Sequence, residues 1–171
     1  MLTIRPYQES DSQNVGVLIA DTYSQFNLAE FSDAQRGEML GPFLHAGSAE
    51  PSHQKAIEDA IRAPTVLVAE TDGRVVGVLR GGRVDELGRT VLQSLFVSGD
   101  YHRRGIGRQL VERFEQDYLA RGATVFKLLA TMEAVPFYLA MGYCKSTGAR
   151  SIHSFEGRGL TSQPMKKVLK K

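Results

Sequence analysis

Hydrophobic and polar positions follow two different periods along the chain, and the period changes several times. Short runs rich in β-branched and other apolar residues are typical of strands, and they occupy residues 2–7, 65–70, 74–81, 90–97 and 124–130. Asp72 and Gly73 separate the second run from the third, and an Asp-Gly pair in that setting predicts a tight hairpin. The chain from Tyr143 onward predicts two closing strands.

The part of the chain between the first and second strands predicts helices. The clearest of them covers residues 10–26, with Ser10 or Ser12 as its expected cap. Its apolar positions recur at helical spacing, at Val15, Leu18, Ile19, Thr22 and Phe26. The stretch that follows is less regular. It predicts one or two helices around residues 30–44 and 53–62, before Pro64 ends the region.

Two further helices are predicted in the second half of the chain. One runs from Gly105 to about Arg121, and Gly122 supplies its stop. Its apolar stripe consists of Ile106, Leu110, Phe114 and Tyr118. The other helix is short and covers residues 133–141. It includes Pro136, which a helix tolerates only in its first turn.

The order of these elements predicts the fold class. A strand is followed by helices, a hairpin, then strand, helix, strand, helix and two strands. That mixture predicts an α/β (α+β) fold, with a central, mostly antiparallel mixed sheet flanked by helices. The strand–helix–strand unit at residues 90–130 supplies one parallel crossover. We expect a single domain over residues 1–171, because that length suits one hydrophobic core.

Composition places the chain among ordinary globular proteins. Hydrophobic residues make up 42% and charged residues 23%, so wholesale disorder is excluded. A net charge of +2 is too small to indicate a nucleic-acid or membrane partner. No apolar run approaches the length of a membrane span, and the N-terminus lacks the apolar core of a secretion signal. We therefore expect a cytoplasmic protein.

Metal-binding and thiol chemistry find little support in the residues. Cys144 is the single cysteine, and we expect it to be a small buried apolar residue rather than a nucleophile. The four histidines are scattered and form no HExxH motif, so no metal site is expected.

One loop carries a clear chemical signal. "DYHRRGIGRQL", residues 100–110, lies between a predicted strand and a predicted helix, and it combines two glycines with three arginines. Unpaired amides at a helix N-terminus and glycines that admit close approach favour an anion, most simply a phosphate or pyrophosphate. The spacing fits neither the P-loop nor the Rossmann fingerprint. Taken alone, the loop is explained as well by an arginine-rich surface turn that caps a helix.

A second motif follows about 30 residues later. "EAVPFYLAMGY" places Ala134, Phe137, Tyr138, Gly142 and Tyr143 on and after the short helix. The two motifs together, in this order, resemble the GNAT superfamily of N-acyltransferases. The resemblance covers the chain from about Leu2 to Leu169, with specific motifs only between residues 92 and 143. Two departures stand out: His102 occupies a position where the family has Gln or Arg, and the Asn that often precedes the second helix is missing.

The resemblance implies how acetyl-CoA would be held and used. Its pyrophosphate would contact the backbone of the loop, at His102, Arg103, Arg104, Gly105, Ile106, Gly107 and Arg108. The strand at 90–97 would splay from its neighbour and pair with the pantetheine arm around Leu95, Phe96 and Val97. A backbone N–H there would stabilise the oxyanion. Tyr138 would be the acid that protonates the leaving thiolate; a core aromatic paired with Phe137 is the simpler alternative. At His102 we expect the backbone to matter more than the ring.

The general base and the amine acceptor are less clearly indicated by the sequence. Neither Gln93 nor Ser94 is a competent base, and Glu70, Asp85 and Glu86 are more simply surface charges, so no base is assigned. The acceptor would be a small-molecule or peptide amine. An acidic excess in residues 27–63 hints at a cationic acceptor, although ordinary helix surface explains it more simply. A homodimer fits the resemblance. The alternatives are a non-catalytic acyl-CoA sensor and a binder of another nucleotide.

Overall fold

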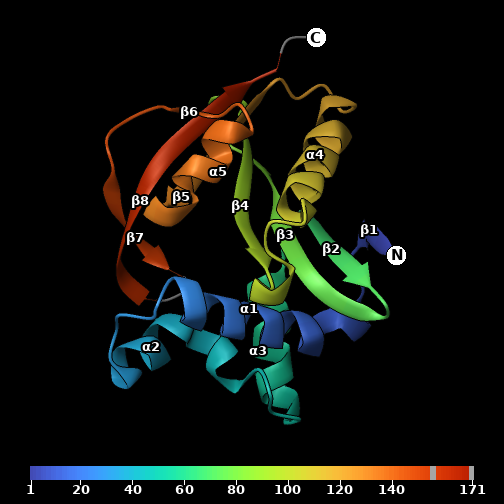
Figure 1. Ribbon diagram of the computed structural model, residues 1–171, viewed down its shortest axis with the longest axis vertical. Helices are drawn as coiled ribbons and strands as arrows, with labels where there is room; N and C mark the ends of the chain where they lie inside the picture. The colour runs from blue at the N-terminus through green and yellow to red at the C-terminus, as the bar shows by residue number, and fades with distance from the viewer. Residues whose placement is uncertain (155–156, 170–171) are drawn as a thin grey trace.

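The computed structural model describes residues 1–154 and 157–169, and it shows a mixed sheet with helices on both faces (Figure 1). The strands are β1 Leu2–Pro6, β2 Thr65–Thr71, β3 Arg74–Val84, β4 Thr90–Val97, β5 Val125–Thr131, β6 Cys144–Lys145, β7 Arg150–Ser154 and β8 Gly157–Val168. The α-helices are α1 Ser12–Phe26, α2 Asp33–Leu40, α3 Pro51–Ile61, α4 Ile106–Leu119 and α5 Val135–Ala140. Short 3₁₀ helices are η1 Glu9–Asp11, η2 Gly41–His45, η3 Gly99–Tyr101 and η4 Met132–Ala134.

The sheet confirms the predicted fold class. Within the described residues its strand order is β1-β2-β3-β4-β5-β8-β6, with β7 paired to β8. Every pair is antiparallel except β4 with β5, which is the predicted parallel crossover. The β2–β3 hairpin is also confirmed: Asp72 and Gly73 both have positive φ, of 51° and 73°, as the tight primed turns require.

The two faces of the sheet bury separate hydrophobic clusters. On one face α1 and α3 pack on Val68, Val78 and Phe96. On the other face α4 and α5 pack on a cluster that includes Leu92 and Phe126. In Figure 1, α1, α2 and α3 lie together in the lower part of the view, and α4 and α5 lie in the upper part. We call these the α1–α3 face and the α4 face.

Several local predictions differ from the structure. The N-cap of α1 is Asp11 rather than Ser10 or Ser12, and it makes no side-chain cap hydrogen bond. Among its described residues the C-terminal part forms three strands instead of two, because β7 folds back on the long strand β8. The prediction that Cys144 is buried is wrong. The residue lies on the short strand β6 at the edge of the sheet, where its side chain is exposed.

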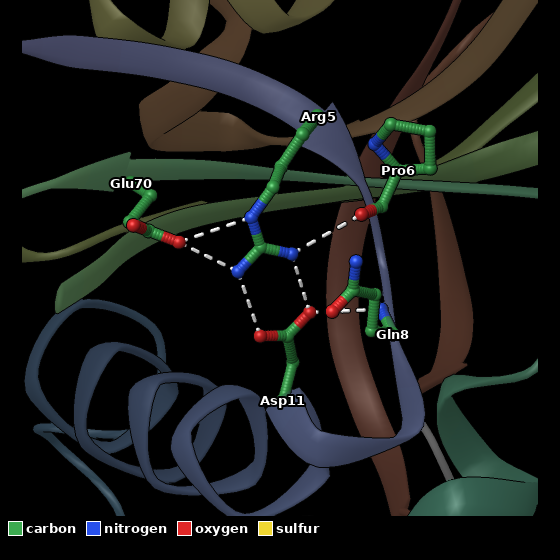
Figure 2. A network of polar contacts seen from close by, with 5 residues as sticks. All are labelled: Arg5, Pro6, Gln8, Asp11 and Glu70. Carbon is green, nitrogen blue, oxygen red and sulfur yellow. Dashed lines mark hydrogen bonds and ion pairs between the residues drawn. The ribbon is translucent and has the colours of Figure 1, made fainter. Parts of the chain in front are cut away.

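The Asp11 carboxylate is bound by other groups, which explains why it makes no cap hydrogen bond to α1. Its carboxylate accepts two hydrogen bonds from the Arg5 guanidinium, at 2.7 and 2.9 Å, and one from the Gln8 backbone N–H at 2.8 Å (Figure 2). The same guanidinium also donates to Glu70 on β2, at 2.6 and 3.0 Å. This network joins β1, η1 and β2. The Arg5 hydrogen bonds hold the pKa of Asp11 below its ordinary value.

We expect Asp11→Asn to destabilise the fold by about 1–2 kcal/mol at pH 7, because it removes charge-assisted hydrogen bonds from a side chain that is only 7% exposed. A carboxyl whose pKa is lowered by folding contributes stability above its unfolded pKa of about 3.9, and that stability is lost as the pH falls through the folded value. The difference between wild type and variant should therefore shrink below about pH 4.

Chemical denaturation at pH 7 and pH 3.5 measures both effects. Asp72→Asn is the matched control, because the carboxylate of Asp72 is 82% exposed and pairs with the N-terminal amine. Its unfolding midpoint should stay close to that of the wild type. Equal unfolding midpoints for the two variants at pH 7 would show that the Arg5 network contributes nothing.

Candidate active site

β4 and β5 separate soon after they meet. Their paired positions are Thr90 with Phe126 and Val91 with Lys127, both at the start of the two parallel strands. β5 stays paired with β8 along its whole length, so β4 is the strand that departs. In Figure 1, β4 and β8 lie close together in the upper part of the view and are farther apart near α1. The expected splay of residues 90–97 is therefore present, and beyond Val91 the edge of β4 that faces away from β3 has no strand partner among the described residues.

A β-bulge lies where the splay begins. Arg80 on β3 is opposite Ser94 on β4, but the next residue, Gly81, is opposite Leu92. Gln93 is therefore an extra residue on β4. Such a bulge bends its strand and redirects backbone and side-chain groups, and bulges are frequent beside active sites. The side-chain oxygens of Gln93 and Ser94 are buried there, without a hydrogen-bond partner among the described residues.

The splay opens into a large pocket of about 980 Å³. That volume is within the range of small-molecule sites. Its lining combines β4, β5, α5 and the α1–α3 face of the sheet. Of the predicted cofactor-binding residues on β4, Leu95 and Phe96 line this pocket, and Tyr138 lines it from α5. The structure thus brings the predicted acid and the predicted pantetheine strand to one cavity.

The glycine loop ends in an uncapped helix N-terminus. Gly105 is the N-cap of α4, with a left-handed φ of 78°, and no side chain of the described residues caps the first amides of the helix. Those amides have no acceptor within the helix either, so they can bind an anion. The first turn passes close to other parts of the site. A Cβ built on Gly107 would lie 3.4 Å from the Phe137 ring and 3.6 Å from Leu95.

The arginines of the loop surround this N-terminus rather than cap it. Arg103, Arg104 and Arg108 are all exposed. The Arg104 guanidinium lies 5.0 Å from the centre of the Tyr101 ring, and Arg108 lies 3.7 Å from Glu112. The loop is thus an exposed, arginine-rich turn at the start of a helix, as the simpler alternative describes, and its cap position is a glycine. Whether its amides also bind an anion stays a prediction.

His102 has a structural role that its sequence position did not indicate. Its Nε2 is hydrogen-bonded to the Val97 carbonyl at 2.8 Å, and its ring stacks on Phe26 of α1 with centroids 4.6 Å apart. The ring thereby links the loop to the end of β4 and to the α1–α3 side. The expectation that the backbone of His102 matters more for the anion stays a prediction.

Tyr138 lies inside the site and is held by its neighbours. Only 6% of the residue is exposed, and its ring makes edge contacts with Phe137 and Tyr143. Burial raises the pKa of Tyr138 above its ordinary value of about 10. The phenol therefore keeps its proton throughout the neutral range.

A buried network that the sequence did not indicate holds the chain just after α5. The Tyr143 hydroxyl donates to Glu115 of α4 at 2.8 Å, and the Lys167 ammonium donates to the other carboxylate oxygen at 2.6 Å. Glu115 itself is 5% exposed. This network fixes the chain that follows α5 against α4 and β8.

None of the candidate bases is well placed. Glu70 is bound to Arg5 and does not line the pocket. Asp85 accepts hydrogen bonds from Lys127 and Arg89, which hold its pKa far below its ordinary range. Glu86 is exposed in the β3–β4 loop. Among the described residues that line the pocket, Asp59 is the one acid, and it pairs with Lys55 and Arg62.

Two other kinds of feature are absent from residues 1–154 and 157–169. No helix there has both the length and the hydropathy that crossing a membrane requires. No three His, Cys, Asp or Glu side chains are grouped so that they could hold a metal ion.

Comparison with known proteins places the chain in a family. The model of the acetyltransferase (GNAT) domain matches residues 19–169. No curated protein matches the chain in sequence. A GCN5-related N-acetyltransferase structure from Rhodopseudomonas palustris has 22% identity and a TM-score of 0.74, and the match covers 98% of this chain and 95% of that one.

Two other similar structures were solved with a ligand. The PaiA N-acetyltransferase from Thermoplasma acidophilum, in complex with coenzyme A, has 13% identity, a TM-score of 0.69 and coverage of 98% and 99%. The putative acetyltransferase yncA from Salmonella typhimurium, with acetyl-CoA, has 18% identity, a TM-score of 0.64 and coverage of 100% and 95%. At these identities the similarity establishes the fold. Because the domain model spans most of the sequence, the chain belongs to the GNAT family of acetyltransferases.

Proposed function

We propose that the protein is an N-acetyltransferase that moves an acetyl group from acetyl-CoA to a primary amine, by direct attack while both substrates are bound. The observation that carries this proposal is the splay of β4 from β5, which opens a pocket that Tyr138 lines. Orientation of two bound substrates supplies a large part of the rate in such a reaction.

The described residues fit coenzyme A at two places. The first amides of α4, from Gly105 to Arg108, would accept the pyrophosphate, with Arg103 and Arg104 at the rim. Gly105 and Gly107 suit this task, because neither carries a side chain that would occupy the cradle. Leu95, Phe96 and Val97 would pair with the pantetheine arm through backbone groups that have no partner on β5; the Val97 carbonyl is not among them, because it is hydrogen-bonded to His102.

The chemistry then needs three contributions from the chain. A backbone N–H of β4 beyond the bulge stabilises the negative charge on the carbonyl oxygen as the amine nitrogen attacks. As the carbon–sulfur bond breaks, Tyr138 donates its proton to the sulfur and recovers one from solvent. The nitrogen loses its extra proton to water, because no carboxylate of the described lining is free to take it.

Calorimetry with acetyl-CoA, and a free-thiol assay with a panel of primary amines, test the proposal. We expect saturable binding that ATP does not displace, and release of coenzyme A thiol that depends on the amine. Failure to bind at millimolar acetyl-CoA would contradict the proposal. Binding without thiol release above background would favour the non-catalytic sensor instead, which the absence of a well-placed base among the described residues also favours.

A further inference from the structure

The pairing register places a set of basic residues on the α1–α3 face of the sheet. Val78 and Phe96 are opposite each other and pack on that face, so Arg80 and its opposite residue Ser94 share it. On β5, Phe126 and Leu128 belong to the α4 face, which leaves Lys127 on the α1–α3 face.

The same register continues to the strands beyond β5. Lys166 on β8 is opposite Lys127 and therefore shares its face. Thr131 is four residues after Lys127 on β5, so it shares the same face. Thr131 is opposite Ser162 on β8, and Ser162 is opposite Arg150 on β7, so Arg150 is on this face as well. Basic side chains from four strands and one loop thus line the pocket. We call this set the basic wall: Arg80, Arg89, Lys127, Arg150 and Lys166.

The acidic residues near the basic wall do not neutralise it. Arg89 and Lys127 both pair with the single carboxylate of Asp85, each at 2.7 Å, so two positive charges share one negative charge. Asp59 lines the pocket from α3, but Lys55 and Arg62 bind it at 2.9 and 3.0 Å. The pocket therefore has an excess of positive charge.

The Arg80 guanidinium holds one of these positive charges in a fixed position near the proposed reaction centre. The residue is 9% exposed, and its Nη1 donates to the Ala60 carbonyl at the end of α3, which orients the guanidinium. It lies opposite Ser94, next to the bulge at Gln93. A guanidinium held in a pocket, away from bulk water, binds carboxylate or phosphate oxygens strongly and with defined geometry.

We propose that the amine acceptor carries an anionic oxygen group, a carboxylate or a phosphate, which the basic wall binds while the amine faces the splay. This inference rests on the proposed function and specifies its substrate class. It replaces the sequence's indication of a cationic acceptor, which was based on the acidic residues of the segment 27–63. Of those acids, Asp59 alone lines the pocket among the described residues, and Lys55 and Arg62 pair with its charge.

Matched pairs of amines test the inference directly. Phenylalanine against phenethylamine adds a carboxylate, and phosphoethanolamine against ethanolamine adds a phosphate; the two arms separate the two sources of negative charge. We expect kcat/KM to be at least about tenfold higher for the anionic member of at least one pair, the effect of one charged hydrogen bond in a partly buried site. Spermidine, which is cationic, should be the poorest acceptor.

Variants locate the effect. Lys166→Glu changes an exposed residue of the basic wall, so it should fold normally, and it should raise KM for the anionic amine about fivefold while KM for acetyl-CoA is unchanged. Arg80→Gln should have a larger effect, and Arg80→Lys should recover part of it. Arg74→Glu is the control, because Arg74 is exposed on the β2–β3 hairpin and outside the pocket.

Different results would contradict the proposed function and the proposed acceptor class. Absence of thiol release with every amine would overturn the proposed function and, with it, this inference. Thiol release without preference for the anionic members would overturn this inference alone. An equal loss in Lys166→Glu and Arg74→Glu would also overturn it, because the effect would then reflect net charge rather than the basic wall.

Discussion

Tyr138→Phe is expected to lower kcat about a hundredfold while the dissociation constant for acetyl-CoA stays within about twofold of the wild type. The substitution removes one hydroxyl from a ring that is otherwise held by Phe137 and Tyr143, so the pocket keeps its shape. It also removes the proton that the leaving thiolate needs. Steady-state kinetics and calorimetry on the same preparation measure the two quantities.

Tyr143→Phe is the matched control for this substitution. Tyr143 lies in the same motif, but its hydroxyl donates to the buried Glu115 and the residue does not line the pocket. Its loss should lower stability by about 1–2 kcal/mol and leave kcat nearly unchanged. If Tyr138→Phe kept the wild-type kcat, or lost acetyl-CoA binding without loss of turnover per bound complex, Tyr138 would be a core aromatic only.

The pH dependence gives a further check on Tyr138. Burial raises its pKa above the ordinary value of about 10, so the phenol is protonated at neutral and moderately basic pH. Ionisation of Tyr138 should therefore cause no decline in kcat between pH 7 and about pH 9.5. A decline in that range that disappears in Tyr138→Phe would show that the hydroxyl ionises much earlier than its burial allows.

Gly105→Val is expected to weaken acetyl-CoA binding about a hundredfold. Gly105 has a φ of 78°, which a β-branched residue adopts only with strain, and its ideal Cβ would stand beside the uncapped amides of α4, 3.9 Å from the Gln109 side-chain nitrogen. The side chain would therefore occupy the position proposed for the pyrophosphate. Several charge-assisted hydrogen bonds would be lost together, which accounts for the size of the effect.

Gly122→Val separates cofactor binding from backbone strain. Gly122 follows α4 with a φ of 92°, and no described atom lies within 4 Å of its ideal Cβ, so valine is strained there in the same way. It should lower stability as Gly105→Val does but leave the affinity for acetyl-CoA unchanged. Similar affinities in the two variants would mean that the α4 N-terminus does not hold the cofactor.

Local patterns predicted much of the fold because they are set by neighbours in sequence. The Asp-Gly pair at 72 and 73 determined a turn, and the apolar stripe from Ile106 to Tyr118 determined α4. The carboxyl of Asp11 is the instructive exception. The sequence favoured Ser10 or Ser12 as the cap of α1, but Asp11 occupies that position, and its carboxylate binds Arg5 of β1, a contact that no local pattern shows.

In the candidate site, too, the features set by neighbours in sequence were predictable, and those set by distant strands were not. Its two motifs were visible in the sequence, because the glycine loop and the helix with Tyr138 are each continuous. The bulge at Gln93 and the basic wall were not, since both depend on the register between strands far apart in the chain. Arg80 ends an apolar run, and its residue type predicts a surface position, yet it is buried in the wall of the pocket.

The most direct test of acetyl transfer is to follow the acetyl group itself. The protein would be incubated with acetyl-CoA that carries a deuterated acetyl group and with an amine that supports thiol release, and the products would be analysed by mass spectrometry. We expect the label on the amine nitrogen in an amount equal to the thiol released, and much less of both with Tyr138→Phe. Thiol release with no label on the amine would contradict N-acetylation as the function of this site.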